Sequence, residues 1–332
     1  MAILKDVPSI NFLGKRRVAF VISLVLIVIS LVSLATRGLN FGLDFTGGVA
    51  VEVRYPAAVE LETVRTELAA AGFADAVVQN FGTTQDVLIR MSPEAGSKAV
   101  DADGAQATLG DRMFRILEAK TPNLTLRRID NVGPQIGDEL TEQGFIALLV
   151  ALGCILIYVG LRFEFRFALG SVAALLHDVI IALGVFSIFQ LSFDLPVLAA
   201  LLAVIGYSLN DTIVVFDRIR ENFTRIRSDD TVEIMNVSVN ETLSRTIMTS
   251  ATTLLVLVFL FVLGGESING FALALIIGVV VGTYSSIYVA SAAALALGVS
   301  REDLLPPEKT EVDGEDVEVD ENGYPIDPFS RP

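Results

Sequence analysis

Long apolar runs separated by short polar stretches fill most of this chain, and six of them are long enough to cross a bilayer. A membrane-spanning helix needs about 20 predominantly apolar residues. The pattern predicts such helices over residues 18–36, 144–161, 168–190, 195–216, 246–264 and 269–297. The first run is longer than the about 7–15 apolar residues of a signal peptide, so we interpret it as an uncleaved anchor.

The segment between the first two spans, residues 37–143, has the pattern of a small folded domain. Residues 48–55 (GVAVEVRY) alternate as a strand does, whereas residues 59–73 have apolar positions at helical spacing. Two further strands, a second helix (106–120) and a closing strand (124–132) follow, with a polar loop insertion at 92–105. The order β-α-β-β-α-β predicts a ferredoxin-like α+β sandwich. We expect this domain to contact a polypeptide or another subunit; a passive spacer is the alternative.

Composition supports the membrane class. Hydrophobic residues make up 52% of the chain, and its mean hydropathy is +0.61. These residues are concentrated in blocks rather than spread evenly. The predicted fold class is therefore an α-helical polytopic membrane protein with six transmembrane helices and one small α+β extracytoplasmic domain. The predicted parts are an N-terminal segment (1–17), a first transmembrane helix (18–36), the α+β domain (37–143), a five-helix membrane region (144–297) and an acidic tail (298–332).

Basic residues are distributed asymmetrically between the loops. They occur before the first span, in the loop between spans two and three, and in the loop between spans four and five. They are absent from the turns after spans three and five. The positive-inside rule therefore predicts that both termini are cytoplasmic and that residues 37–143 lie outside the inner membrane. Residues 301–332 carry eleven acidic and three basic residues, which predicts a disordered tail, either simply solvated or docking on a basic partner.

Several classes of function are disfavoured by what the sequence lacks. The single cysteine, Cys154, excludes a disulfide within the chain, and no phosphate-binding G-x-x-x-x-G-K-[ST] motif occurs. ATP hydrolysis by this chain is not expected. One histidine without a cysteine partner predicts no structural metal site. We expect no cofactor, no nucleic-acid partner, and an energy source other than ATP.

One carboxylate lies inside the fourth predicted span. Asp211 is six residues before Asp217, where charges resume, which places it roughly 9 Å into the apolar zone at about 1.5 Å per residue. A charge near the bilayer centre costs about 2.5–3.5 kcal/mol on insertion scales. Asp211 must therefore be paired, protonated or hydrated. Ser208 shares its helix face and Asn210 is its neighbour; a purely structural hydrogen bond is the alternative interpretation.

Other polar residues at membrane depth extend this pattern. His177 and Asp178 lie within the third span, and Arg245 begins the fifth. A carboxylate that can bind a proton, a fixed guanidinium and nearby hydroxyls are the parts of a proton relay, so we predict Asp211 and Arg245 as its main groups. His177, Asp178, Ser208 and Asn210 are candidate auxiliary groups, although a structural His–Asp pair explains the first two equally well. Protons would be the coupling ion, and no residue is predicted to be catalytic.

Two glycine motifs are interpreted structurally. Gly47 and Gly48 end the stretch GLDFTGG (42–48) and are expected to form a tight turn with positive φ, rather than an anion cradle. Gly278 and Gly282 are spaced for close helix packing in the sixth span.

Six stretches together resemble the SecF branch of the SecD–SecF family of protein export membrane proteins, from about Asn11 to Leu297. They are GLDFTGG (42–48), VGPQIGDEL (132–140), LLHDV (175–179), IGYSLNDTIVVFDRIREN (205–222), SRTIMTS (244–250) and GTYSSIYVA (282–290). GLDFTGG alone would not separate SecF from SecD, but the single small exported domain is typical of SecF.

The resemblance implies a resistance–nodulation–division-type bundle in the bacterial inner membrane, of which this chain forms one half and SecD the other. It implies that the proton motive force helps complete translocation of unfolded preproteins through the SecYEG channel after the SecA ATPase has begun it, with YajC as an associated subunit. On this basis Asp211 takes the position of the proton-carrying carboxylate, and Arg245 that of the arginine that responds to it.

Three rival functions remain open at the level of sequence. The main one is a small-molecule or lipid exporter of the resistance–nodulation–division superfamily. An intramembrane aspartyl protease built on Asp178 and Asp211 is a second, although the residues preceding each aspartate differ from the expected contexts. A passive scaffold for other subunits is the third.

Overall fold

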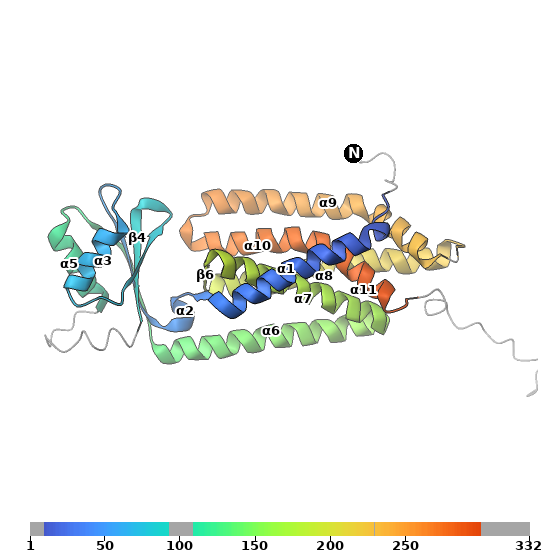
Figure 1. The fold of residues 1–332 in the computed structure, drawn as a ribbon, viewed down its shortest axis with the longest axis horizontal. Coiled ribbons are helices and arrows are strands. Elements are labelled where there is room, and N and C mark those ends of the chain that lie inside the picture. Colours follow the sequence, from blue (N-terminus) through green and yellow to red (C-terminus); the bar gives the residue numbers. More distant parts are fainter. Residues whose placement is uncertain (1–9, 93–108, 229, 300–332) are drawn as a thin grey trace, which may run out of the picture.

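The computed structural model describes residues 10–92, 109–228 and 230–299, which form a long helical bundle with a small α/β domain at one end (Figure 1). The predicted loop insertion at 92–105 lies almost wholly outside the described residues, as do most of the N-terminal segment and the acidic tail. Six helices in the described part are long and apolar enough to cross a membrane, which confirms the predicted membrane fold.

The bundle is built from one helix before the α/β domain and five after it. These are α1 (Arg16–Arg37), α6 (Pro134–Arg162), α7 (Phe165–Phe189), α8 (Leu195–Arg225), α9 (Thr231–Leu263) and α10 (Glu266–Ser285). A π-helical turn (Ser286–Ala290) and α11 (Ser291–Ala296) continue the sixth span. Two helices begin well before the predicted apolar runs, at Pro134 and Thr231, because a helix continues beyond the apolar zone when its polar end is capped. Gly133 precedes Pro134, and Asp230 accepts a hydrogen bond from Val232 N.

The centre of the bundle is formed by α7, α8 and α10, whereas α1, α6 and α9 leave most of their apolar surface uncovered. Small residues let the central helices approach closely. A Cβ atom at Gly278 would collide with the side chain of Val204, and one at Gly282 would lie 3.0 Å from the Ser208 Cβ. Glycines therefore determine the spacing of α8 and α10, as predicted for a close-packing motif.

The α/β domain consists of β2 (Gly48–Arg54), α3 (Leu61–Ala70), β3 (Val77–Phe81), β4 (Thr83–Met91), α5 (Leu109–Lys120) and β5 (Thr125–Val132). The strands form one antiparallel sheet in the order β3-β4-β2-β5. Helices α3 and α5 cover one face, over a core that includes Val51, Val53, Leu68, Ile89 and Leu117 (Figure 1). This arrangement confirms the predicted ferredoxin-like sandwich.

A compact junction connects the domain to the bundle. Strand β1 (Asn40–Phe41) pairs in parallel with β6 (Ser192–Phe193), just before α8. The GLDFTGG stretch contains a short helix, α2 (Leu43–Thr46), that sequence analysis took as part of a turn. Gly47 and Gly48 follow with φ of 64° and 115°, and a Cβ atom at Gly48 would collide with Met91 O.

Candidate functional site

The Asp178 carboxylate lies at the centre of a buried polar cluster in the membrane region. Its Oδ1 atom is 2.9 Å from Nδ1 of His177 on the same helix, α7. Its Oδ2 atom accepts a 2.5 Å hydrogen bond from Ser208 Oγ on α8 and a 2.7 Å hydrogen bond from Ser285 Oγ on α10. Asp178 is 1% exposed, so this one side chain joins the three central helices without contact with solvent. A buried carboxylate requires hydrogen bonds of this kind to both of its oxygens.

His177 extends the cluster to α1. Its Nε2 atom lies 3.2 Å from Ser23 Oγ, and Ser23 Oγ lies 3.0 Å from the Tyr284 hydroxyl. Tyr284 also donates a 2.8 Å hydrogen bond to Ala19 O. Sequence analysis did not find this link. Its only signal was a set of hydroxyl residues within the sixth span and three serines in the first, and nothing in their spacing placed them beside His177.

Asp211 lies on α8 one turn beyond Ser208, and its carboxylate is hydrogen-bonded less completely than that of Asp178. Its side chain is 3% exposed, yet Oδ2 has no hydrogen-bond partner within the described part of the chain. The hydroxyl groups of Tyr207 and Thr246 are likewise buried without a partner. Asn210, by contrast, is exposed and forms no described hydrogen bond with either aspartate. A buried carboxylate without a protein donor needs a proton, a water molecule or a cation instead.

Arg245 on α9 is exposed, and its positive charge acts on the Asp211 carboxylate from a distance. No ion pair between the two appears among the interactions of the described residues. The structure therefore brings the predicted pair within electrostatic range without direct contact. Thr246, the next residue, is 1% exposed, and Ser250 one turn later forms a 2.7 Å hydrogen bond with Thr283 on α10.

The π-helical turn at Ser286–Ala290 follows directly after Ser285 and was not predicted from the sequence. A π turn widens the helix and leaves its backbone bonding irregular, and such turns are frequent at functional sites. A Cβ atom at Gly170 on α7 would lie 3.1 Å from Ala290 O, so α7 packs closely on this turn.

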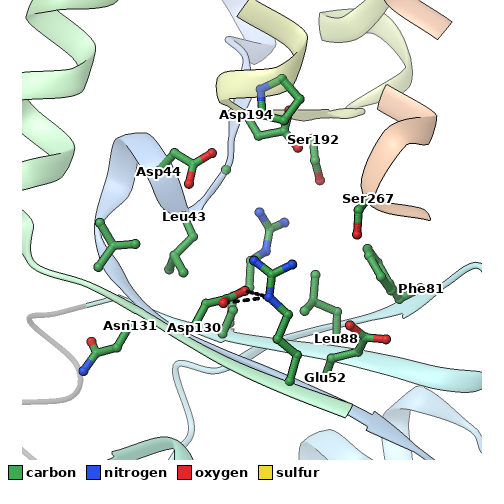
Figure 2. A pocket seen from close by; sticks show the side chains of 16 residues that line it. Leu43, Asp44, Glu52, Phe81, Leu88, Asp130, Asn131, Ser192, Asp194 and Ser267 are labelled. Atoms are coloured by element: carbon green, nitrogen blue, oxygen red, sulfur yellow. Dashed lines mark hydrogen bonds and ion pairs between the residues drawn. The ribbon is translucent and has the colours of Figure 1, made fainter. Parts of the chain in front are cut away.

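A cavity of about 370 Å³ separates the uncovered face of the sheet from the ends of the membrane helices that lie nearest to it (Figure 2). Asp44 and Asp194 line it on the membrane side, and Glu52 and Asp130 line it on the sheet. Asp44 accepts a 3.0 Å hydrogen bond from Leu195 N, the first residue of α8.

Two arginines, Arg90 and Arg128, partly offset the four carboxylates that line this cavity. Arg128 forms a 2.7 Å ion pair with Asp130 on the sheet. Burial raises the pKa of the Asp194 carboxyl; the bond from Val197 N opposes this shift and the negative charge of Asp44 adds to it. Burial likewise lowers the pKa of Arg90, which faces Asp194 across the cavity. These groups position the junction and offer no arrangement for bond chemistry.

Comparison with known proteins identifies the family. The model of the protein export membrane protein SecD/SecF C-terminal family matches residues 113–300, and that of the SecD/SecF GG motif matches residues 32–55. The SecF protein translocase subunit of Vibrio alginolyticus is 52% identical over 96% of this chain and 98% of its own length. That of Pseudomonas aeruginosa is 50% identical over 91% of this chain and 96% of its own length.

A solved structure agrees with the sequence comparison. The crystal structure of SecDF, a translocon-associated membrane protein from Thermus thermophilus, superimposes with a TM-score of 0.78 at 40% identity. It covers 87% of this chain, whereas this chain spans only 39% of SecDF. The predictions of a multi-pass membrane protein and of a transport subunit rather than an enzyme are confirmed by these matches. The chain belongs to the SecD/SecF family of protein export membrane proteins, within which it matches the SecF translocase subunits.

Proposed function

We propose that this subunit couples proton movement to the late steps of protein export, with Asp211 as the group that binds the proton. The observation that carries the proposal is the contrast between two buried carboxylates one helix apart. Asp178 has three hydrogen-bonding partners, whereas Oδ2 of Asp211 has none among the described residues. The unsatisfied carboxylate is the one that gains most from taking up a proton.

Arg245 is proposed as the group that responds to this proton. An ionised Asp211 attracts the guanidinium, and a protonated Asp211 does not. The attraction between α8 and α9 would thus change with each proton bound and released. A proton that crosses a potential of about 100 mV supplies about 2.3 kcal/mol, which drives such a change without ATP.

The start of α8 offers a mechanical route from this site to the outer domain. Helix α8 runs from Asp211 back to Leu195, whose N–H is held by Asp44 of α2. Strand β6, immediately before α8, pairs with β1, and α2 leads directly into β2 of the sheet. A shift of α8 would therefore move the domain. His177, Asp178 and Ser208 are proposed as positioning groups that hold α8 on α7, and Asn210, which is exposed, is left without a role.

Orientation is proposed from the charges at the end of the bundle remote from the domain. Arg162 and Arg225 form ion pairs with Asp217 and Glu241 there, and Arg16 and Arg17 begin α1 at the same end (Figure 1). By the positive-inside rule this end is cytoplasmic, so both termini are cytoplasmic and the domain lies outside the inner membrane.

The partners are proposed on the basis of family membership and of uncovered surface. SecD would supply the second half of the bundle, consistent with the 39% of SecDF that this chain spans and with the exposed apolar faces of α1, α6 and α9. SecYEG, an unfolded preprotein, SecA acting indirectly, and YajC complete the proposed assembly. No feature of the described residues favours a small-molecule or lipid exporter over this function.

The direct test is export of a trapped preprotein into membrane vesicles with and without a proton gradient. Asp211→Asn keeps the side-chain shape and removes the charge, and we expect it to abolish the gradient-dependent part of export. Asp217→Asn is the matched control, because it makes the same change on the same helix at an exposed position. Full gradient-dependent export by Asp211→Asn would refute the proposed role.

A further inference from the structure

A groove of about 600 Å³ lies between the start of α1 and the end of the sixth span. Arg16 and Arg17 line it in the first turn of α1, followed by Phe20 and Val21 one turn later. Its opposite wall is made by residues of α11, namely Ala292, Leu295 and Ala296. The groove thus combines two cations with an apolar wall.

Two contacts determine where the helices separate. Tyr284 donates a hydrogen bond to Ala19 O of α1, and the Phe12 ring packs against the Tyr288 ring with centroids 5.8 Å apart. These contacts hold α1 on the sixth span. The wall beyond them carries alanine at positions 292 and 296, whose methyl groups are too small to fill the space. The groove therefore exists because the contacts keep α1 at a fixed distance from the sixth span and the alanine side chains there do not fill the gap.

Arg16 and Arg17 differ from Arg162 and Arg225 at the same end of the bundle. Arg162 pairs with Asp217 at 2.9 Å, and Arg225 pairs with Glu241 at 2.6 Å. No ion pair or side-chain hydrogen bond to Arg16 or Arg17 occurs within residues 10–92, 109–228 and 230–299. Both side chains are exposed, so an anionic ligand can reach them without displacing an ion pair of the described residues.

We propose that this groove binds an anionic phospholipid, with the phosphate on Arg16 and Arg17 and an acyl chain along Phe20, Val21 and Leu295. A guanidinium presents paired donors that match phosphate oxygens. Phe20 and Val21 are 65% and 57% exposed, which suits contact with lipid in a membrane helix. Basic pockets between membrane helices are a recognised type of headgroup site. The inference depends on α1 spanning the membrane and not on the proton-relay proposal.

Such a lipid would brace the sixth span beside its π-helical turn. The groove adjoins Tyr284 and Tyr288, which connect α1 to the polar cluster and to that turn. Occupancy would hold the end of α1 against α11. After its loss, α1 would still be held on the sixth span by contacts such as those of Tyr284 with Ala19 and Ser23, but its end would no longer be held against α11.

Native mass spectrometry of the full-length chain in detergent tests the site, with added phosphatidylglycerol or phosphatidylcholine carrying the same acyl chains. We expect the parent to bind one phosphatidylglycerol in preference to phosphatidylcholine. The double variant Arg16→Gln/Arg17→Gln should bind phosphatidylglycerol about tenfold more weakly or worse, because each arginine near an anionic headgroup contributes about 1 kcal/mol. Ala292→Phe should fill the groove and weaken binding without a change in charge.

Arg227→Gln is the matched control, since Arg227 is exposed, has no described ion pair and lies outside the groove; it should bind as the parent does. Thermal unfolding of each variant identifies any that fail to fold, and Ala296→Phe provides a second way to fill the groove. Unchanged preference in the double variant would overturn the proposal. So would displacement of the lipid by millimolar inorganic phosphate, which would indicate a simple anion site. Tighter lipid binding after removal of residues 301–332 would overturn it as well, by showing that the acidic tail is the natural occupant.

Discussion

Ser208 Oγ donates a 2.5 Å hydrogen bond to Oδ2 of Asp178 and so ties α8 to α7 one turn before Asp211. Asp211, the proposed proton site, is therefore positioned by Ser208 on its own helix. The Ser208 hydroxyl binds the carboxylate of Asp178 and not that of Asp211. The two aspartates at membrane depth thus have different roles: one holds the helices together and the other is proposed to bind the proton. Asp178 is held by several hydrogen bonds, whereas Oδ2 of Asp211 has no donor among the described residues.

Removal of this bond should weaken both the bundle and the coupling. In Ser208→Ala, Asp178 retains His177 and Ser285 but loses one donor, which should destabilise the protein by about 1–3 kcal/mol. We expect a lower unfolding temperature and a partial loss of gradient-dependent export. Ser171→Ala is the control, because Ser171 is equally buried but donates only to Phe167 O of its own helix. Equal effects of the two variants would argue against a positioning role for Ser208.

The close approach of α8 and α10 should be sensitive to side-chain size at one glycine. Gly278→Val would push its side chain into Val204, and overpacking of this kind costs about 1–3 kcal/mol. Thermal unfolding in detergent should detect this loss. Gly153→Val on α6 meets no other atoms within contact distance, so it should have little effect. A Gly278→Val protein as stable as Gly153→Val would mean that the two helices are not held in this packing.

The junction between α2 and α8 should transmit movement to the α/β domain. Asp44→Ala removes the acceptor for Leu195 N, which should cost about 1 kcal/mol and uncouple the domain from α8. We expect the proton-dependent component of export to fall while membrane insertion stays normal. Asp130→Ala, in the same cavity but paired with Arg128 of the sheet, should leave that component intact. The reverse result would place the coupling on the sheet side of the cavity.

The α/β domain should lose stability in acid because it depends on one ion pair. Arg54 holds Asp86 with two hydrogen bonds of 2.6 Å and thereby, against a smaller opposing effect of burial, lowers the pKa of Asp86 to about 2. A carboxyl whose pKa is lower in the folded state stabilises the fold above its unfolded pKa of about 3.9, and loses that contribution as the pH falls toward 2.

Hydrogen-exchange protection of β2 and β4, corrected for intrinsic exchange rates, should therefore decrease between about pH 4 and pH 2 in the parent protein. In Asp86→Asn the decrease should be smaller and protection at neutral pH lower. Arg65→Gln, which breaks an exposed pair with Glu62, should retain the parent profile. A profile that Asp86→Asn does not alter would show that other carboxyls control the acid response.

Much of the fold could be predicted from the sequence because its signals are local. Apolar length alone located the six spans, and alternation of apolar residues located the strands of the domain. Helix ends such as Pro134 and Thr231 could not be predicted, since the polar residues there carry no membrane signal. The short helix α2 was missed because glycines on both sides of it indicated a turn.

The candidate site, like the fold, could be predicted only where its signal is local in the sequence. Asp211 was identifiable because a carboxylate in an apolar run is conspicuous in any sequence. The bonds of Asp178 to Ser208 and Ser285 depend on the packing of three helices that are distant in the chain, so no spacing could reveal them. Arg245 was identifiable as a guanidinium at the start of the fifth span, and the family resemblance supported its pairing with Asp211, but its separation from Asp211 became visible only in three dimensions.

The most direct measurement is difference infrared spectroscopy of the subunit with SecD in lipid vesicles, on acidification of the outer medium. The account predicts a band from a newly protonated carboxyl group that is absent in Asp211→Asn and retained in Asp178→Asn. A band that persists in Asp211→Asn, or disappears only in Asp178→Asn, would contradict it.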